Sequence, residues 1–394
     1  MAATDREQGV TVMDDERGPL RDLVVLDLTI ARAGPTAVRY LADWGARVLR
    51  IEPRDPGGQL LTDHESSDYL NLHRSKGLIQ LDLRDDVDRR EFFRLVGHAD
   101  VIVENNRAPV KAKLGIDYDA VSLVNPRIVY ASISGYGQDG PASAKGAVDQ
   151  IIQGAGGLMS ITGPPGAGPV RAGIAVSDSA AGHQLALGIM IALYDRQRTG
   201  RGQWVKVSLL EAMISFLDFQ AVRYTIDGHV PETEGNHHPT ARPMGTYRAA
   251  DGYLNLAAPG ERLWQRLCEV LDDPALVADE RFATPRSRYH HRDELNDELE
   301  ARLVTRSRDE WIERLDAVGI PCGPVNTMDE VFADPQVQHL AMLATVEHAT
   351  RGPVDVLRDP ITMSRSAPVV PTAAPMPGAD PGAVLDALGI PRAG

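Results

Sequence analysis

The sequence predicts an α/β protein with an open parallel sheet in a large domain and a second, smaller α+β domain. In the first half of the chain, short runs of β-branched residues and leucine alternate with segments of helical spacing, which is typical of a parallel sheet covered by helices. A loop rich in proline, glycine and histidine follows over 231–245, and beyond it a hairpin signal precedes three amphipathic helices. The length of 394 residues is enough for this two-domain organisation.

The elements of the large domain follow from local signals, such as acidic residues at helix starts and a glycine stop at Gly45. The expected order is a strand at 23–29, a helix over 36–46, a strand at 47–53, a helix over 85–99, strands at 100–105 and 126–137, a buried helix over 183–195, and a strand with one long helix over 202–224. Ligands of such folds lie at the carboxyl ends of the strands, so the loops that follow strands are the candidate sites.

The small domain is predicted from a change in character after the Pro/Gly/His-rich loop. Its expected elements are a hairpin over 245–258 with its turn at Asp251–Gly252, and helices over 261–271, 292–304 and 308–319. The remaining C-terminal chain is Pro-rich and is expected to be irregular. The predicted division is a flexible tail over 1–18, the large α/β domain over 19–225, a linker over 226–245, the small α+β domain over 246–335, and a segment over 336–394 that returns to the large domain.

Charge and composition exclude several classes of function. The chain has 41 basic and 55 acidic residues, a formal net charge of −14, whereas a nucleic-acid surface needs clustered lysine and arginine. We therefore expect no nucleic-acid partner, and an anionic small ligand only where basic residues gather locally. The longest nearly apolar run, 185–194, is about half of the ~20 residues that a membrane span requires. Without a targeting signal at the start, the expected location is cytoplasmic, with no membrane partner.

Several familiar motifs are missing from the sequence. The loop after the first strand reads IARAGP, with a single glycine, where a dinucleotide-binding fold carries GxGxxG. The P-loop and the GxSxG elbow of serine hydrolases are missing too. His237 and His238 lie in the Pro-rich loop and are expected to be solvated, and Cys268 and Cys322 are expected to be reduced thiols. No metal is therefore expected.

Asp178 is the one acid in a segment, 172–188, that is almost entirely small or apolar. One interpretation makes it the N-cap of the following helix. The other makes it a nucleophile at a strand-end cleft, because a carboxylate is ionised at pH 7 and can form covalent intermediates. Small neighbours such as Ser177, Ser179 and Gly182 leave room for a substrate. The spacing alone leaves both interpretations open.

Seven ordered blocks carry a resemblance that extends over about residues 19–345. They are VLDLTIARAGPTAVRYLADWGARVLRIEP, ENNRAPVKAKLGIDY, NPRIVYASISGYGQDGP, GGLMSITG, ALYDRQRTGRGQWVKVSLLEA, ADGYLNLAAPGERLWQRL and VGIPCGPVNTMDEVFADPQ. In these blocks the chain resembles the class III CoA-transferase family. That family contains formyl-CoA:oxalate CoA-transferase, the carnitine and bile-acid CoA-transferases, and α-methylacyl-CoA racemase.

The resemblance implies that Asp178 is the catalytic aspartate. It would take an acyl group from an acyl-CoA donor as an aspartyl anhydride, become an aspartyl-CoA thioester, and pass CoA to a carboxylic acid acceptor. The implied substrate is coenzyme A or acyl-CoA, without a metal, and the implied architecture is a Rossmann-like large domain with a smaller α+β domain in an interlocked homodimer. The residues that the resemblance places along CoA are Ile30, Ala31, Arg32, Ala33, Arg50, Lys76, Asn105, Asn106, Arg107 and Lys113.

Departures from the family pattern bear on the reaction. Val148 stands where the racemase branch carries a histidine that acts as a second acid or base, and His183 is expected to be a helix residue that points elsewhere. The glycine run of the formyl-CoA:oxalate enzymes is missing from 234–253, and Arg32 lies at or beside their first-loop glutamine. Arg32 could hold a carboxylate acceptor, such as a dicarboxylic acid, or a CoA phosphate.

The leading hypothesis from the sequence is thus a CoA-transferase that acts through Asp178. The nearest alternative is an α-methylacyl-CoA racemase or epimerase. A non-catalytic CoA-binding subunit of a heteromeric transferase is the third.

Overall fold

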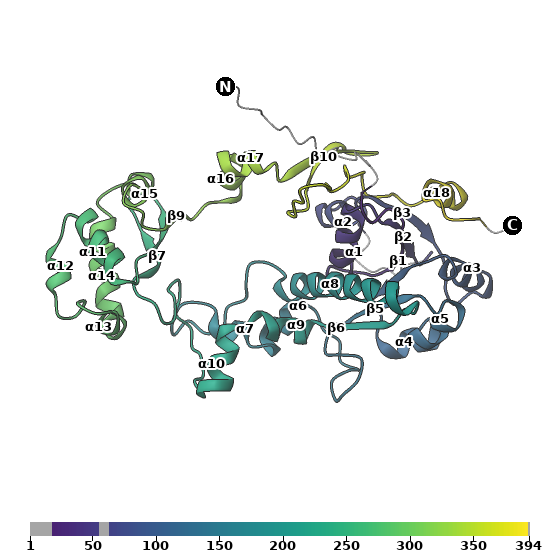
Figure 1. Ribbon diagram of the computed structural model, residues 1–394, viewed down its shortest axis with the longest axis horizontal. Coiled ribbons are helices and arrows are strands. Elements are labelled where there is room, and N and C mark those ends of the chain that lie inside the picture. Colours follow the sequence, from purple (N-terminus) through teal and green to yellow (C-terminus); the bar gives the residue numbers. More distant parts are fainter. Residues whose placement is uncertain (1–17, 55–62, 393–394) are drawn as a thin grey trace, which may run out of the picture. The chain divides into compact units, whose positions relative to one another are not determined.

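The computed structural model describes residues 18–54 and 63–392, and the described chain forms two compact units (Figure 1). The first unit holds the residues up to Leu158, Ala172–Val222 and those from Ala341 onward, and the second holds Met159–Arg171 and Arg223–Leu340. Residues 159–171 join the second unit, although the predicted large domain runs without interruption from 19 to 225. The predicted tail lies, except for Gly18, outside the described residues.

The first unit is built on a six-stranded parallel sheet with the order β3-β2-β1-β4-β5-β6. Its strands are β1 (Val24–Leu28), β2 (Arg47–Glu52), β3 (Lys76–Gln80), β4 (Val101–Glu104), β5 (Val129–Ser134) and β6 (Trp204–Ser208). The predicted α/β class with an open parallel sheet is confirmed. The strand order reverses between β1 and β4, so the loops after these two strands border the switch point at which such sheets bind ligands.

Each face of this sheet has its own core, because successive residues of a strand point to opposite faces. Val25 belongs to the core that α1 (Ala33–Asp43) and α8 (Val176–Thr199) cover. The next residue, Leu26, belongs to the other core, which includes residues of α3 (Asp86–Val96). The near-continuous apolar strands of the sequence are explained by this burial on both faces.

Helix α8 has 24 residues and is longer than the predicted segment 183–195. It ends where Gly200 adopts φ 71°, the left-handed conformation of many helix C-caps. Helix α1 approaches it closely at Gly182, where a β-carbon would lie 2.7 Å from the carbonyl oxygen of Ala33. This approach brings the start of α1 beside the first turns of α8, and the two helices lie side by side in Figure 1.

Shorter helices complete the chain up to residue 227, where residues 159–161 and 223–227 belong to the second unit. They are α2 (Ser67–Leu72), α4 (Ala108–Leu114), α5 (Tyr118–Val124), α6 (Asp149–Ala155), α7 (Leu158–Ile161), α9 (Leu209–Phe216) and α10 (Phe219–Asp227). The single long helix predicted up to residue 224 is wrong. Asp218 adopts φ 44°, a left-handed conformation that ends α9 before α10 begins.

The C-terminal segment contains regular structure where the sequence predicts an irregular chain. Strands β10 (Leu343–His348) and β11 (Gly352–Leu357) form an antiparallel hairpin, and helix α18 (Pro381–Ala387) follows. Val346 is buried in the hairpin, and Leu385 is buried in the core that includes α3. The expectation is wrong here because the burial of these apolar side chains outweighs the Pro-rich composition.

The second unit has its own core beside a three-stranded antiparallel sheet. Strands β7 (Met244–Arg248) and β8 (Tyr253–Ala257) form the predicted hairpin, which is confirmed, and β9 (Cys322–Pro324) pairs with β8. The core contains the fully buried Trp264 and Trp311. The helices of this unit are α11 (Glu261–Val270), α12 (Ala275–Ala278), α13 (Pro285–His290), α14 (Arg292–Leu303), α15 (Arg308–Asp316), α16 (Met328–Ala333) and α17 (Pro335–Leu340). Over residues 18–54 and 63–392, no helix is both long enough and apolar enough to cross a membrane.

Candidate active site

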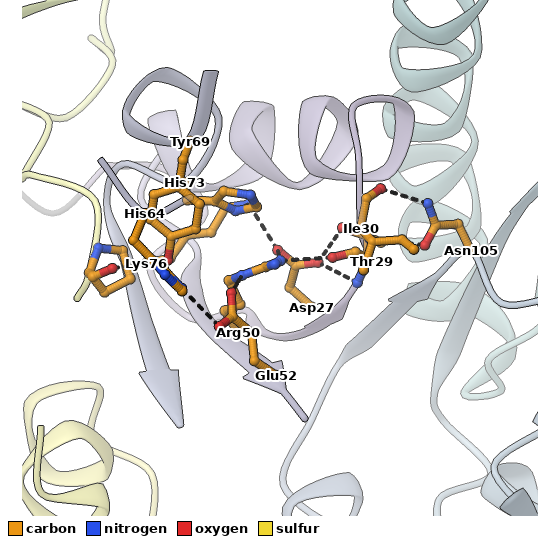
Figure 2. Close-up of polar contacts among 11 residues, drawn as sticks. Asp27, Thr29, Ile30, Arg50, Glu52, His64, Tyr69, His73, Lys76 and Asn105 are labelled. Atoms are coloured by element: carbon orange, nitrogen blue, oxygen red, sulfur yellow. Dashed lines mark hydrogen bonds and ion pairs between the residues drawn. The ribbon is translucent and has the colours of Figure 1, made fainter. Parts of the chain in front are cut away.

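The loop after β1 is held in one conformation by the loop after β4. The side-chain carbonyl of Asn105 accepts a hydrogen bond from the Ile30 backbone N–H at 3.0 Å, and the Asn105 amide donates to the Ile30 carbonyl at 2.8 Å (Figure 2). The next residue, Ala31, has φ 61°, which a non-glycine residue adopts only where its surroundings hold it there. The predicted binding segments 30–33 and 105–107 are therefore brought together.

Asp27, near the end of β1, is the centre of a buried charged network (Figure 2). Its carboxylate accepts hydrogen bonds from the Thr29 backbone N–H at 3.0 Å and the Thr29 hydroxyl at 2.5 Å. It also pairs with Lys76 Nζ at 2.9 Å and with the Arg50 guanidinium at 3.6 Å. Burial alone raises the pKa of Asp27, but Lys76 and Arg50 outweigh burial and lower that pKa. The ionised Asp27 thus fixes Thr29, the residue that opens the first loop.

Arg50 and Lys76, both predicted along CoA, belong to this network. Arg50 also donates to Glu52 at 2.6 Å and to the Thr29 carbonyl at 2.8 Å. The exposed fractions of the Arg50 and Lys76 side chains are 4% and 0%, and burial lowers the pKa of Lys76 to about 8. Both charges are matched inside the protein and support the first loop. Their direct contact with CoA stays a prediction, which would require them to leave Asp27.

The other predicted CoA residues follow β4. The Asn106 backbone N–H donates to the Glu104 carboxylate at 2.8 Å, which fixes the start of this loop. Arg107 is exposed and lies over Gly146, where a β-carbon would meet its guanidinium at 2.7 Å. Lys113 is exposed in the last turn of α4. Arg107 and Lys113 are accessible to an anionic ligand, and their roles stay predictions.

Asp178 lies in the first turn of α8, but it is not the N-cap. The N-cap is Ala175, so Asp178 is the third residue of the helix, and the interpretation of Asp178 as an N-cap is wrong. Its side chain is half-buried. Within the described part of the chain, its carboxylate takes part in no hydrogen bond or ion pair. The carboxylate is therefore available for chemistry.

Asp149, in the first turn of α6, holds the start of α8 in place. One carboxylate oxygen accepts hydrogen bonds from the Ser177 backbone N–H at 2.9 Å and the Ser177 hydroxyl at 2.8 Å. The other accepts from the Gln153 amide at 2.7 Å, and the Gln153 carbonyl accepts from the Ala172 N–H at 2.9 Å. Sequence reasoning missed this pair. Its signal is an acid and an amide one helical turn apart in an otherwise mostly apolar segment.

The surroundings of Asp178 raise the pKa of its carboxyl to about 6. Burial is the main cause, the nearby Asp149 carboxylate adds to the rise, and the Arg32 guanidinium opposes it. At pH 7 a carboxyl with this pKa is about nine-tenths ionised, and the N–H groups of the first helical turn favour the charged form. Asp178 thus offers an ionised, partly desolvated carboxylate, which is more basic than an exposed aspartate and a better nucleophile.

A racemase would need a second group that transfers a proton opposite Asp178, and neither Val148 nor His183 provides one. Val148 carries an isopropyl group, which cannot transfer a proton. His183 Nδ1 donates to the Ser179 carbonyl at 2.5 Å, and Nε2 lies 2.7 Å from the Tyr40 hydroxyl oxygen. Both nitrogens of His183 are therefore engaged by groups other than Asp178.

The histidine pair of the Pro-rich loop lies in the second unit. The Nδ1 atom of His238 accepts hydrogen bonds from the backbone N–H groups of Thr240 and Ala241 at 3.2 and 3.1 Å. This nitrogen therefore stabilises the conformation of the loop. In the ranges that the structure covers, no three His, Cys, Asp or Glu side chains form a group that could hold a metal ion.

Comparison with known proteins identifies the family of the chain. The profile described as CoA-transferase family III matches residues 20–381. The chain belongs to this family. The predicted family and enzyme class are therefore confirmed, and the enzyme is a CoA-transferase of family III.

Similar proteins agree with this family. A succinate–glutarate CoA-transferase of Agrobacterium fabrum is 34% identical over 369 residues, which are 91% of this chain and 92% of that protein. The human succinyl-CoA:glutarate CoA-transferase is 33% identical over 86% of this chain and 78% of its own length. The crystal structure of a CAIB/BAIF family protein from Brucella suis matches with a TM-score of 0.83 and 34% identity, over 94% of this chain and all of that chain.

Proposed function

We propose that the enzyme moves CoA from an acyl-CoA donor to a carboxylic acid acceptor through covalent intermediates on Asp178. The observation that carries the proposal is this half-buried carboxylate, whose pKa is raised to about 6. Its helix starts beside the loop that follows β1, at the switch point of the sheet. A thioester is an acyl donor that a carboxylate can attack, and covalent capture keeps the acyl group activated.

The proposed reaction balances without an oxidant, reductant or metal. A carboxylate oxygen of Asp178 attacks the thioester carbonyl, the C–S bond breaks, and CoA leaves as a thiolate. The thiolate attacks the Asp178 carbonyl of the mixed anhydride, which releases the donor carboxylate and leaves an aspartyl-CoA thioester. The acceptor carboxylate displaces the thiolate to form a second anhydride. The thiolate then attacks the acceptor's acyl carbon, which yields the new acyl-CoA and restores Asp178.

Residues of the two switch-point loops bind CoA in this proposal. The backbone of residues 30–33 lies along its pantetheine arm, where the hydrogen bonds from Asn105 fix the backbone of Ile30. Arg107 and Lys113 are exposed cations, and they bind the phosphates as charge-assisted partners. Because the protein has a net charge of −14, the negatively charged CoA binds only where cations such as these gather locally.

The class of acid is proposed from the relatives. Those named for succinate and glutarate, or for succinyl-CoA and mesaconate, act on acids with two carboxyl groups. We propose that at least one substrate of this enzyme is likewise a dicarboxylic acid. Transfer is favoured over racemisation because Val148 and His183 provide no second base opposite Asp178.

The test is a search for the covalent intermediate by mass spectrometry. The purified chain is incubated with hydroxylamine and, in turn, with succinyl-, glutaryl-, acetyl- and formyl-CoA. Hydroxylamine traps an anhydride or thioester of aspartate as a hydroxamate, which is about 15 Da heavier than the acid. The expected result is this shift on the peptide that contains Asp178, with the physiological donor. A chain that binds CoA but is modified by no donor would contradict the mechanism and favour a non-catalytic subunit.

A homodimer is part of the same proposal. Leu187, Ile191 and Tyr194 are 62%, 60% and 64% exposed, and their spacing of four and three places them on one side of α8. A large apolar stripe at the surface is typical of a subunit interface, and a second copy of the chain covers it in our proposal. The interlocked arrangement is implied by the family resemblance.

Sedimentation velocity tests the dimer. The expected species has twice the chain mass of 42.7 kDa, and Ile191→Glu is expected to shift it toward the single chain. Leu123→Glu is the matched control, because Leu123 is 85% exposed on α5, away from α8. A wild-type protein that sediments as a single chain would refute the dimer.

A further inference from the structure

Arg32 lies at the start of α1, close to the first turn of α8 that carries Asp178. It is the N-cap residue of α1, but its side chain does not cap the helix. The next residue, Ala33, has its carbonyl against Gly182, which lies one turn after Asp178 on the same side of α8. Arg32 therefore lies beside the first turn of α8, near enough that its charge acts on the Asp178 carboxyl.

The guanidinium of Arg32 is paired, but in an exposed position. It donates to the Asp68 carboxylate in the first turn of α2 at 2.5 Å, and the two side chains are 33% and 69% exposed. Lys76 is, by contrast, completely buried against Asp27. Exposed ion pairs contribute little to stability. The Arg32 guanidinium can therefore exchange Asp68 for another carboxylate, whereas Lys76 cannot leave its partner at comparable cost.

The backbone that carries Arg32 is fixed before any ligand arrives. Asn105 holds both polar backbone groups of Ile30, and Ala31 keeps its left-handed φ of 61°. A binding group on a preorganised backbone loses little freedom when its ligand arrives, which favours both affinity and selectivity. The loop thus presents the guanidinium at a set position beside Asp178.

We propose that Arg32 binds the free carboxylate of a dicarboxylic substrate while the other carboxyl group reacts at Asp178. Asp68 holds the guanidinium when no substrate is bound. A guanidinium recognises a carboxylate through two parallel hydrogen bonds, so acids without a second carboxylate gain nothing from Arg32. This makes Arg32 a specificity-determining residue, and the inference rests on the proposed transfer of CoA through Asp178.

The test compares acceptors that differ only in the second carboxylate. The probes are succinate and glutarate against butyrate and valerate, with the donor identified by hydroxamate formation. Arg32→Gln is expected to lower kcat/KM for the dicarboxylates about 30- to 100-fold, and for the monocarboxylates less than about threefold. Arg32→Lys is expected to be intermediate. Asp68→Asn is expected to lower KM for dicarboxylates several-fold, because it removes the competing carboxylate.

Arg89→Gln is the matched control. Arg89 pairs with Asp86 at the same 2.5 Å, with side chains 39% and 73% exposed, but in the first turn of α3. An equal loss with all four acceptors, together with a higher KM for acyl-CoA, would assign Arg32 to CoA and overturn the inference. Unchanged acceptor preference in Arg32→Gln would overturn it as well.

Calorimetric titration separates this inference from the proposed function. Glutarate is titrated into the wild-type chain and into Arg32→Gln, each with CoA present. One outcome is that the wild-type chain never forms a hydroxamate but binds glutarate, and that Arg32→Gln does not bind it. This outcome would support the carboxylate site and refute only the covalent transfer. Equal glutarate binding by both proteins would overturn the role of Arg32 whatever the activity.

Discussion

Asp178→Asn is expected to lower the turnover of CoA transfer by at least about 10⁴-fold, because an amide cannot form the anhydride. Asp178→Asn should also form no hydroxamate when it is incubated with the donor and hydroxylamine. In the wild-type enzyme, kcat/KM is expected to fall about tenfold per pH unit below a pH near 6, where the Asp178 carboxyl takes up its proton. Full turnover in Asp178→Asn, or a hydroxamate on another residue, would contradict the assignment.

The same substitution is expected to stabilise the fold above pH 6. Burial raises the pKa of Asp178 from 3.8 to about 6, so the folded state holds this proton more tightly than the unfolded state. The ionised carboxylate therefore destabilises the protein above pH 6, and this penalty disappears as the pH falls to about 4. With solvent screening, Asp178→Asn should add on the order of 1–2 kcal/mol to the free energy of unfolding at pH 7.5, and little at pH 4.

Urea unfolding at the two pH values measures this difference. Asp119→Asn is the control, because Asp119 is an exposed carboxylate in the first turn of α5 and should change neither turnover nor stability appreciably. Less stability of Asp178→Asn than of wild type at pH 7.5 would show that the Asp178 carboxylate is not desolvated as described. Reactive groups in active sites commonly lower the stability of the fold, because they are held in environments that disfavour them.

Asp27→Ala is expected to lower the free energy of unfolding by about 3–5 kcal/mol, because it leaves a buried ammonium without its counter-ion. Lys76 has no exposed side-chain surface, and its Nζ lies 2.9 Å from Asp27. Arg50 would keep Glu52, at 2.6 Å. The first loop should also loosen, since Asp27 binds both the N–H and the hydroxyl of Thr29. Urea unfolding followed by circular dichroism gives the stability.

The double variant Asp27→Ala/Lys76→Met tests the physical reason. If the loss comes from the unpaired ammonium, removal of both charges should restore much of the stability. Asp86→Ala is the comparison at the surface, where the pair with Arg89 has side chains 73% and 39% exposed, and it should cost less than about 1 kcal/mol. Equal losses in the single and double variants would mean that Lys76 does not depend on Asp27.

Local signals in the sequence were sufficient for the class of fold and for most of its elements. Strands buried on both faces read as apolar runs, as at β1, β4 and β5, and turn residues mark the β7–β8 hairpin. The break at Asp218 was not predicted, because nothing in a continuous helical pattern shows that one residue will adopt φ 44°. Strand β3 was missed as well, since its sequence KGLIQ carries a weak local signal.

Continuous stretches of the sequence are enough to identify the family, to predict the parallel sheet and to single out Asp178 as the candidate nucleophile. The contacts of Lys76 with Asp27, 49 residues away, and of Asn105 with Ile30, 75 residues away, form only in the folded chain. The fold also shows that Asp149, rather than Asp178, supports the start of α8. These pairs depend on strand order and on helices packed from distant segments. Local residue patterns cannot specify such contacts, because hydrogen bonds and ion pairs act over a few ångströms of space and not along the sequence.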